Sequence, residues 1–229
     1  ALRELAQDGD VKLERRDTAV AMLGLAQEPS PESVELARDI STDTEQPSQR
    51  TATLALGNMA NRLRAQGDES GDALVQQLIA RLNAAQTEDE RALALAALGN
   101  TGAPGLGEAL APWLEHEAPG TRANATWALR LVDNEQAFNV LAEKALSDAD
   151  NLVRTKAVGA MRYRHADRSV PVLANVLERD RDSGVRLEAL STLAQSDSPE
   201  VLPIVERVVK NDKDPNVKQQ AESMLPAAG

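Results

Sequence analysis

One pattern recurs at a fixed distance in the second half of the chain. The copies are spaced by 32 residues (186 − 154 and 218 − 186). Their shared positions are Asp150, Val153, Arg154, Ala157 and Met161, then Asp182, Val185, Arg186, Ala189 and Leu193, then Asp214, Val217, Lys218, Ala221 and Leu225. A period of this size is typical of stacked helical pairs, in which each pair buries its apolar face against its neighbours.

The same pattern extends to the start of the chain. The last apolar position of each first helix is predicted at Leu23, Leu56, Leu98, Leu129, Met161, Leu193 and Leu225. An alanine precedes it by four residues every time, at Ala19, Ala52, Ala94, Ala125, Ala157, Ala189 and Ala221. Positions four apart share one stripe of a helix, so this stripe is expected to be buried. A small residue at each such position predicts that neighbouring helices cross closely.

The spacing predicts an all-α fold, an α-α superhelix (solenoid) of about six helical pairs plus a terminal helix, in a single domain over residues 1–229. The first helices are expected from near Arg15, Thr51, Thr87, Asp150, Asp182 and Asp214, and the fourth of the seven includes the ATWALR stretch at 125–130. The second helices are expected near residues 31–40, 72–85, 106–115, 136–146, 170–179 and 199–210, with a polar linker at Ser41–Ser48. Because the chain begins within a helix-like stretch and ends on an unpaired first helix, we expect a fragment of a longer protein.

Glycines and polar residues predict where helices begin and end. Thr87 followed by Glu90 has the signature of a capping box. Gly24, Gly57 and Gly99 directly follow the last apolar position, where a left-handed helix terminator is expected, and Gly102 is a further stop. The acidic turns at 147–150, 178–182 and 210–214 are interpreted as helix caps, because they lack the central glycine and closing glutamate of a calcium loop.

Composition excludes several classes of function. The chain has 36 acidic and 25 basic residues and a net charge of −11, which argues against a nucleic-acid partner. It has no cysteine, so disulfides and thiolate metal sites are excluded. No run of about 18 apolar residues is present, so no membrane span is predicted. The two histidines, His116 and His165, fall in turns of different units without an oriented partner, so no catalytic residue, metal or cofactor is predicted.

Two groups of residues are candidates for partner binding. Arg162, Tyr163, Arg164 and Arg168 form the one local basic cluster, beside His165, in a turn where they could contact a protein or simply be solvated. Glu143, Asn175 and Arg207 occupy equivalent polar positions of three second helices, the helices that line the concave face of such a solenoid. Their mixed charge fits a protein or peptide better than a phosphate polymer. Trp127, at a position that is small in other units, is interpreted as a filler of the adjacent core.

The repeated D-x-x-V-R-x-x-A-x-x-x-L units resemble HEAT repeats. The resemblance covers essentially the whole chain and implies a ladder of charged residues along the turns, formed by Asp150, Asp182 and Asp214 with Arg154, Arg186 and Lys218. Exposed pairs of this kind contribute roughly 0–1 kcal/mol each. The family resemblance implies a non-catalytic scaffold that binds a protein partner, or adjacent domains of the same protein, through its concave face.

A narrower resemblance covers residues 51–161. TATLALGNMANR, RALALAALGNTGAPG, ATWALR and VRTKAVGAM occur in the order seen in the helical domain of vitellogenin-type large lipid-transfer proteins. This similarity implies an alternative function, the helical part of a lipid-transfer or lipoprotein-like assembly that could contact lipid. A third class, a HEAT-like lyase or glycosylase, needs a pocket with a paired acid and base or a basic surface, and neither is evident in the sequence.

The repeat register can be tested with one substitution. Leu193→Asp places a carboxylate between stacked helices without a partner, so the array should lose its cooperative thermal unfolding. Circular dichroism at 222 nm during heating measures this. An unchanged melting temperature would show that the register is wrong.

Overall fold

The computed structural model describes residues 1–8, 11–43 and 47–226. Within these ranges the chain forms fifteen α-helices and two 3₁₀ helices, and contains no strand. The all-α fold and the six helical pairs with a terminal helix are confirmed. The chain divides into two compact units, Ala1–Ala109 and Leu110–Gly229, and each is described separately. Part of the expected linker at Ser41–Ser48, residues 44–46, lies outside the described residues.

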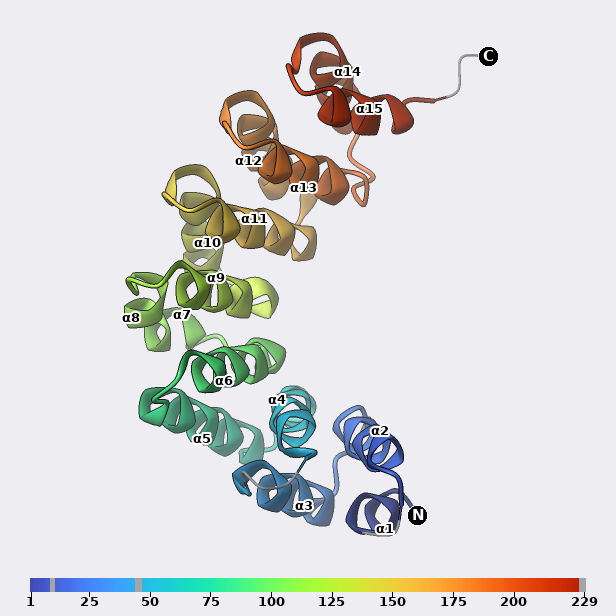
Figure 1. The fold of residues 1–229 in the computed structure, drawn as a ribbon, viewed down its shortest axis with the longest axis vertical. Coiled ribbons are helices and arrows are strands. Elements are labelled where there is room, and N and C mark those ends of the chain that lie inside the picture. Colours follow the sequence, from blue (N-terminus) through green and yellow to red (C-terminus); the bar gives the residue numbers. More distant parts are fainter. Residues whose placement is uncertain (9–10, 44–46, 227–229) are drawn as a thin grey trace. The chain divides into compact units, whose positions relative to one another are not determined.

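The first unit holds the helices α1 to α7. Their bounds are Leu2–Gln7 (α1), Leu13–Gly24 (α2), Pro31–Thr42 (α3), Gln49–Ala65 (α4), Ser70–Ala84 (α5), Glu88–Thr101 (α6) and Leu106–Ala109 (α7). Helices α2, α4 and α6 pack side by side, and α3 and α5 pack against them as second helices (Figure 1). The helix expected from residue 72 begins earlier, at Ser70, and α4 before it ends at Ala65.

Local sequence signals account for several helix ends in this unit. The Ser30 side chain accepts a hydrogen bond from the backbone N–H of Ser33, at 3.3 Å, ahead of Pro31 in the first turn of α3. The predicted capping box is confirmed, because Thr87 Oγ1 accepts from Glu90 N at 3.2 Å and Glu90 Oε2 accepts from Thr87 N at 3.0 Å. Gly102 ends α6 with a left-handed φ of 58°.

The other three glycines do not terminate helices as expected. Gly24 is the last residue of α2 and Gly57 and Gly99 lie inside α4 and α6, none with a positive φ. A Cβ atom on Gly57 would lie 2.1 Å from the backbone oxygen of Ala97 in α6, and one on Gly24 would lie 2.6 Å from the Cβ of Ala55 in α4. Glycine is required at these two positions because the helices approach too closely for any side chain.

The second unit holds α8 to α15. Their bounds are Ala111–Leu114 (α8), Pro119–Ala128 (α9), Leu129–Leu131 (η1), Glu135–Ser147 (α10), Asn151–Ala160 (α11), Met161–Tyr163 (η2), Ala166–Arg179 (α12), Ser183–Leu193 (α13), Val201–Asn211 (α14) and Pro215–Ser223 (α15). The first helices α9, α11, α13 and α15 form one layer, and the second helices α10, α12 and α14 form the other (Figure 1). The helix expected at 106–115 is instead two short helices, because Pro112 has no N–H to continue the backbone hydrogen bonds.

The core follows the predicted stripe of each first helix. All seven alanines of the stripe, Ala19, Ala52, Ala94, Ala125, Ala157, Ala189 and Ala221, are at most 1% exposed. Leu56, Leu98, Leu129, Met161 and Leu193 are equally buried, whereas Leu225 lies beyond the end of α15 and is half-buried. Alanine at each crossing lets the helices of the first layer pack closely, which confirms the repeat register.

Arginine–aspartate pairs connect successive turns in the second unit, but they are not the pairs expected. Arg154 in α11 donates from Nε and from a terminal nitrogen to the two carboxylate oxygens of Asp180, at 2.7 and 3.0 Å. Arg186 in α13 binds Asp212 in the same way, at 2.7 and 2.9 Å, and Arg122 in α9 binds Asp148 at 3.2 and 3.1 Å. The acid of each pair therefore lies two residues before Asp150, Asp182 or Asp214.

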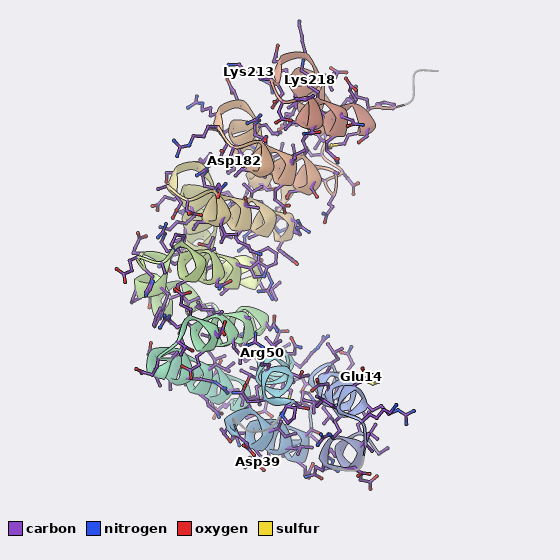
Figure 2. The ribbon with its side chains drawn as sticks, in the orientation of Figure 1. Glu14, Asp39, Arg50, Asp182, Lys213 and Lys218 are labelled. Atoms are coloured by element: carbon purple, nitrogen blue, oxygen red, sulfur yellow. The ribbon has the colours of Figure 1, made fainter. Side chains whose placement is uncertain are left out.

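The predicted acids Asp150, Asp182 and Asp214 are helix N-caps instead. Their side chains accept hydrogen bonds from the first backbone N–H groups of α11, α13 and α15. Asp182, labelled in Figure 2, also accepts a hydrogen bond at 2.7 Å from the side chain of Asn151 in the preceding repeat. Lys218, expected to continue the ladder, has no ion-pair partner among residues 1–8, 11–43 and 47–226.

The ladder pairs are buried, which also differs from the expectation of exposed pairs. The side chains of Arg154 and Asp180 are 7% and 6% exposed, and those of Arg186 and Asp212 are 11% and 5% exposed. Each arginine also donates to backbone carbonyls of the turn before its own helix, as Arg186 does to Asp180 O at 2.9 Å. Burial alone would raise the pKa of Asp212, but hydrogen bonds from Arg186 and the Asp214 backbone, with the charge of Arg186, lower it.

The cost of an unpaired charge in this ladder is measurable. Asp180→Ala leaves the guanidinium of Arg154 buried without its counter-ion, so we expect a loss of about 3–5 kcal/mol in the free energy of unfolding. Urea denaturation followed by circular dichroism gives this value.

Two further variants serve as controls for the Asp180 measurement. Asp182→Ala removes a helix cap and an exposed hydrogen bond from Asn151 but no buried ion pair, and should cost about 1 kcal/mol. The double variant Arg154→Leu/Asp180→Ala should be more stable than Asp180→Ala alone, because no unpaired charge remains. Equal losses in Asp180→Ala and Asp182→Ala would contradict the role of the buried pair.

Candidate partner-binding groove

A groove with a volume of about 870 Å³ lies between the second helices α12 and α14 and the turns that follow them. Two of the predicted residues, Asn175 in α12 and Arg207 in α14, line it. Glu143, at the equivalent position of α10, is exposed and is not among the lining residues. The structure therefore places two of the three predicted second-helix residues at one groove.

The amphipathic sequence of the two helices positions these side chains. Leu173, Val176 and Leu177 of α12 are buried, as are Ile204, Val205 and Val208 of α14. Asn175 and Arg207 lie outside this buried stripe. Asn175 is half-buried and Arg207 is exposed. Leu177, Ile204 and Val208 also line the groove, so its floor is partly apolar.

The charges at the groove divide into bound and free groups. Asp212 is held by Arg186, Asp180 by Arg154, and Asp214 accepts backbone hydrogen bonds as the cap of α15. Three lining cations remain, Arg181, Arg207 and Lys213, the last labelled in Figure 2. All three are exposed, and none has a hydrogen-bond or ion-pair partner within the part of the chain that the structure describes. Glu178 is the exposed lining acid.

The predicted basic cluster lies at the other end of the helices and is engaged within the chain. Arg162 forms an ion pair of 2.7 Å with Glu188 in α13, and Arg168 forms one of 2.9 Å with Glu135 and lies 3.9 Å over the ring of Phe138. Tyr163 is 46% exposed and packs edge-on against Trp127. These contacts join neighbouring repeats, and a partner would have to compete with them or use the exposed Tyr163.

Arg164 is the most deeply engaged member of the cluster. Its terminal nitrogens donate to the backbone carbonyls of Leu129 and Arg130 in the preceding repeat, at 2.8 and 3.1 Å. Burial of the guanidinium lowers its pKa, because the charged form loses hydration. Arg164 therefore supplies additional donors to the carbonyls of η1, where Leu129 O also accepts the N–H of Val132. Sequence alone did not distinguish this structural role from that of an exposed basic residue.

Trp127 occupies the space between two repeats. Its half-buried ring contacts Tyr163, and the cations of Arg130 and Lys156 lie 5.2 and 5.4 Å from its centre. A Cβ atom on Gly159 in α11 would lie 3.5 Å from the ring, an ordinary contact distance, and 2.7 Å from Oε1 of Glu188. This packing agrees with the interpretation of Trp127 as a filler.

The two histidines are not brought together. His116 lies between α8 and α9, where its Nδ1 accepts from the backbone N–H of Ala118 at 3.1 Å, and His165 precedes α12. No group of three histidine, cysteine or carboxylate side chains suited to a metal ion occurs among the described residues. Across the same residues, none of the helices combines the length and apolarity that crossing a bilayer requires.

Sequence reasoning missed two sets of functional or structural residues. The ladder acids Asp148, Asp180 and Asp212 recur at the 32-residue step, so their period was visible, but the neighbouring cap aspartates share the same period. Arg181 and Lys213 also repeat at that step and were hidden in turns of mixed charge. Their freedom from ion pairs depends on side-chain contacts, which a repeat pattern does not specify.

These features define a class of protein, a helical-repeat solenoid with a groove on its second-helix face. The family model of HEAT repeats matches residues 75–162 and 139–226, which together span most of the chain. The chain belongs to the HEAT-repeat family. No curated protein sequence matches it significantly.

Solved structures share the fold at low sequence identity. Kap121p bound to Nup53p is 16% identical, with a TM-score of 0.55 over 98% of this chain and 29% of that chain. A HEAT-like repeats protein of the archaeon Thermococcus onnurineus NA1 is 17% identical, with a TM-score of 0.49 over 97% of this chain and 94% of that one. Human deoxyhypusine hydroxylase is 18% identical, with a TM-score of 0.45 over 97% of this chain and 82% of that chain.

The contribution of Arg164 to stability can be compared with that of Arg162. Arg164→Ala removes the guanidinium donor from two part-buried carbonyls and leaves Leu129 O only the N–H of Val132, so we expect a loss of about 2 kcal/mol in the free energy of unfolding. Arg162→Ala removes a partly exposed ion pair, and should cost less than about 1 kcal/mol. Chemical denaturation of both variants checks this, and an equal loss would argue against the special role of Arg164.

Proposed function

We propose that this chain is a non-catalytic protein-binding module that holds its partner on the second-helix face. The groove between α12 and α14 carries this proposal, because two residues predicted from repeat position, Asn175 and Arg207, line it together. A groove of about 870 Å³ with an apolar floor and free polar groups at its rim has the properties of a binding site.

The chemistry of the groove favours binding over catalysis. Its lining residues include no histidine, and the Asp214 carboxylate beside the Ser183 hydroxyl is occupied as the cap of α15, so the residues offer a binding surface rather than a reacting group. The similar fold of Kap121p, which binds Nup53p in the solved complex, is compatible with a protein partner. The partner could be a separate protein or an adjacent domain of the same protein.

The other candidate surfaces have less support. The cluster of Arg162, Tyr163, Arg164 and Arg168 stays a prediction of partner contact, although its arginines are engaged between repeats. Glu143 likewise stays a prediction on α10. The lipid-assembly alternative depends only on the sequence resemblance over residues 51–161, and no contact described above favours it.

Peptide display tests the proposed function with an unbiased set of ligands. Random peptides are selected on the immobilised chain, and the enriched sequences are measured by fluorescence anisotropy. Asn175→Trp fills the groove and Arg207→Ala removes an exposed side chain from its rim, so both should weaken binding by about tenfold or more, the effect of losing a central contact.

Glu206→Trp and Glu206→Ala provide matched controls on α14. Glu206 is exposed and does not line the groove, so these variants should bind the selected peptides as the unmodified chain does. Thermal unfolding of each variant checks that the fold is retained. The proposal fails if no peptide is enriched over an unrelated helical protein, or if the groove and control variants bind equally.

A further inference from the structure

The charge that a ligand would meet in the groove differs from the charge of the chain as a whole. The net charge of the chain is −11. The groove-lining groups without partners are nevertheless three cations, Arg181, Arg207 and Lys213, and one exposed acid, Glu178. The remaining carboxylates are committed to the ladder and to the cap of α15. Three free cations against Glu178 and the cap carboxylate of Asp214 leave a small excess of positive charge at the groove.

The arrangement of these cations suits carboxylates. Arg181 and Lys213 extend from successive turns, and Arg207 lies on α14 between them in sequence. A guanidinium can donate two parallel hydrogen bonds to one carboxylate, whereas an ammonium acts as a compact point charge. Unpaired donors in a groove are thus available to more than one acidic side chain of the same ligand.

The rest of the lining is suited to a polypeptide. Asn175 and Asn211 carry amides that can both donate to and accept from the backbone of an extended chain. Leu177, Ile204 and Val208 offer apolar contact for side chains between the acidic ones. Amides that satisfy backbone groups, with pockets for alternate side chains, are a recurring means of holding extended peptides.

A phosphate polymer fits the same surface poorly. Nucleic acids bind through many Lys and Arg contacts to a continuous line of phosphates. Here the carboxylates of Glu178 and Asp214, which no cation pairs, interrupt the free cations, so the cations form no continuous line. A peptide can place neutral or basic residues opposite these two carboxylates, whereas a nucleic acid carries a charge at every residue.

We infer that the groove between α12 and α14 binds an extended acidic segment of a protein partner, with Arg181, Arg207 and Lys213 as the carboxylate-binding residues. This inference rests on the proposed function and specifies the chemistry of the partner. An extended segment of eight residues spans roughly 26 Å, which exceeds the 8–10 Å that typically separates two packed helices. One short segment can therefore contact both repeats.

The test uses the full chain and three labelled eight-residue peptides. The first has glutamate at alternate positions with serine and leucine between them, and the second and third have glutamine or lysine in place of glutamate. Fluorescence anisotropy measures their dissociation constants at low and physiological salt. The glutamate peptide should bind at least about tenfold more tightly than the glutamine peptide, with a difference that shrinks as salt rises.

Charge reversal locates the interaction. Arg207→Glu/Lys213→Glu should weaken binding of the glutamate peptide by about tenfold or more and improve binding of the lysine peptide. The matched control is Arg179→Glu/Lys210→Glu, which changes the net charge by the same amount on the same segments. Arg179 and Lys210 are exposed and do not line the groove, so the control should retain most of the affinity.

Each outcome supports or overturns the inference. Equal binding of the glutamate and glutamine peptides, equal losses in both reversed variants, or no binding of the glutamate peptide would each overturn it. Tighter binding of a single-stranded DNA oligonucleotide, lost in the same groove variant, would replace the acidic peptide with a phosphate ligand. If neutral or basic peptides from the display selection bind and are lost in Asn175→Trp, the proposed function stands although the acidic preference fails.

Discussion

The second unit depends on charged pairs that are removed from water between its repeats. Each ladder arginine binds the carboxylate of the turn after its helical pair and the carbonyls of the turn before its own helix. Two charges buried together are stable only when most of their hydrogen-bonding groups are satisfied, and here the aspartate also accepts a backbone N–H. The ladder therefore specifies the register of successive repeats more than it adds to stability.

Apolar packing between helices holds the repeats together, whereas the ladder specifies their register. With only 2% aromatic residues, the core is made of leucine, alanine and valine, and each crossing is narrow. In the first unit, Gly57 and Ala97 bring the backbones of α4 and α6 into direct contact. Such contacts gain dispersion energy over a long shared surface, because small residues allow main chains to approach.

Sequence reasoning predicted the fold better than the site, for a physical reason. The period of 32 residues and the alanine stripe report which face of a helix is buried, and burial is what defines the repeat. Sequence reasoning could not tell which aspartate pairs with the ladder arginine. Asp180 and Asp182 have the same period and differ only in which neighbour they contact. Asn175 and Arg207 were selected by repeat position, while Arg181 and Lys213 emerged only once the groove lining and their lack of partners were known.

Arg186 has a consequence for the groove that it helps to line. It donates to the backbone of Asp180, next to Arg181, and to the side chain of Asp212, next to Lys213. One buried side chain thus spans the gap between the two turns and holds both ends of the rim. The backbone spacing between Arg181 and Lys213 is therefore fixed before any ligand binds, so that binding has the two exposed side chains to order but not the turns that carry them.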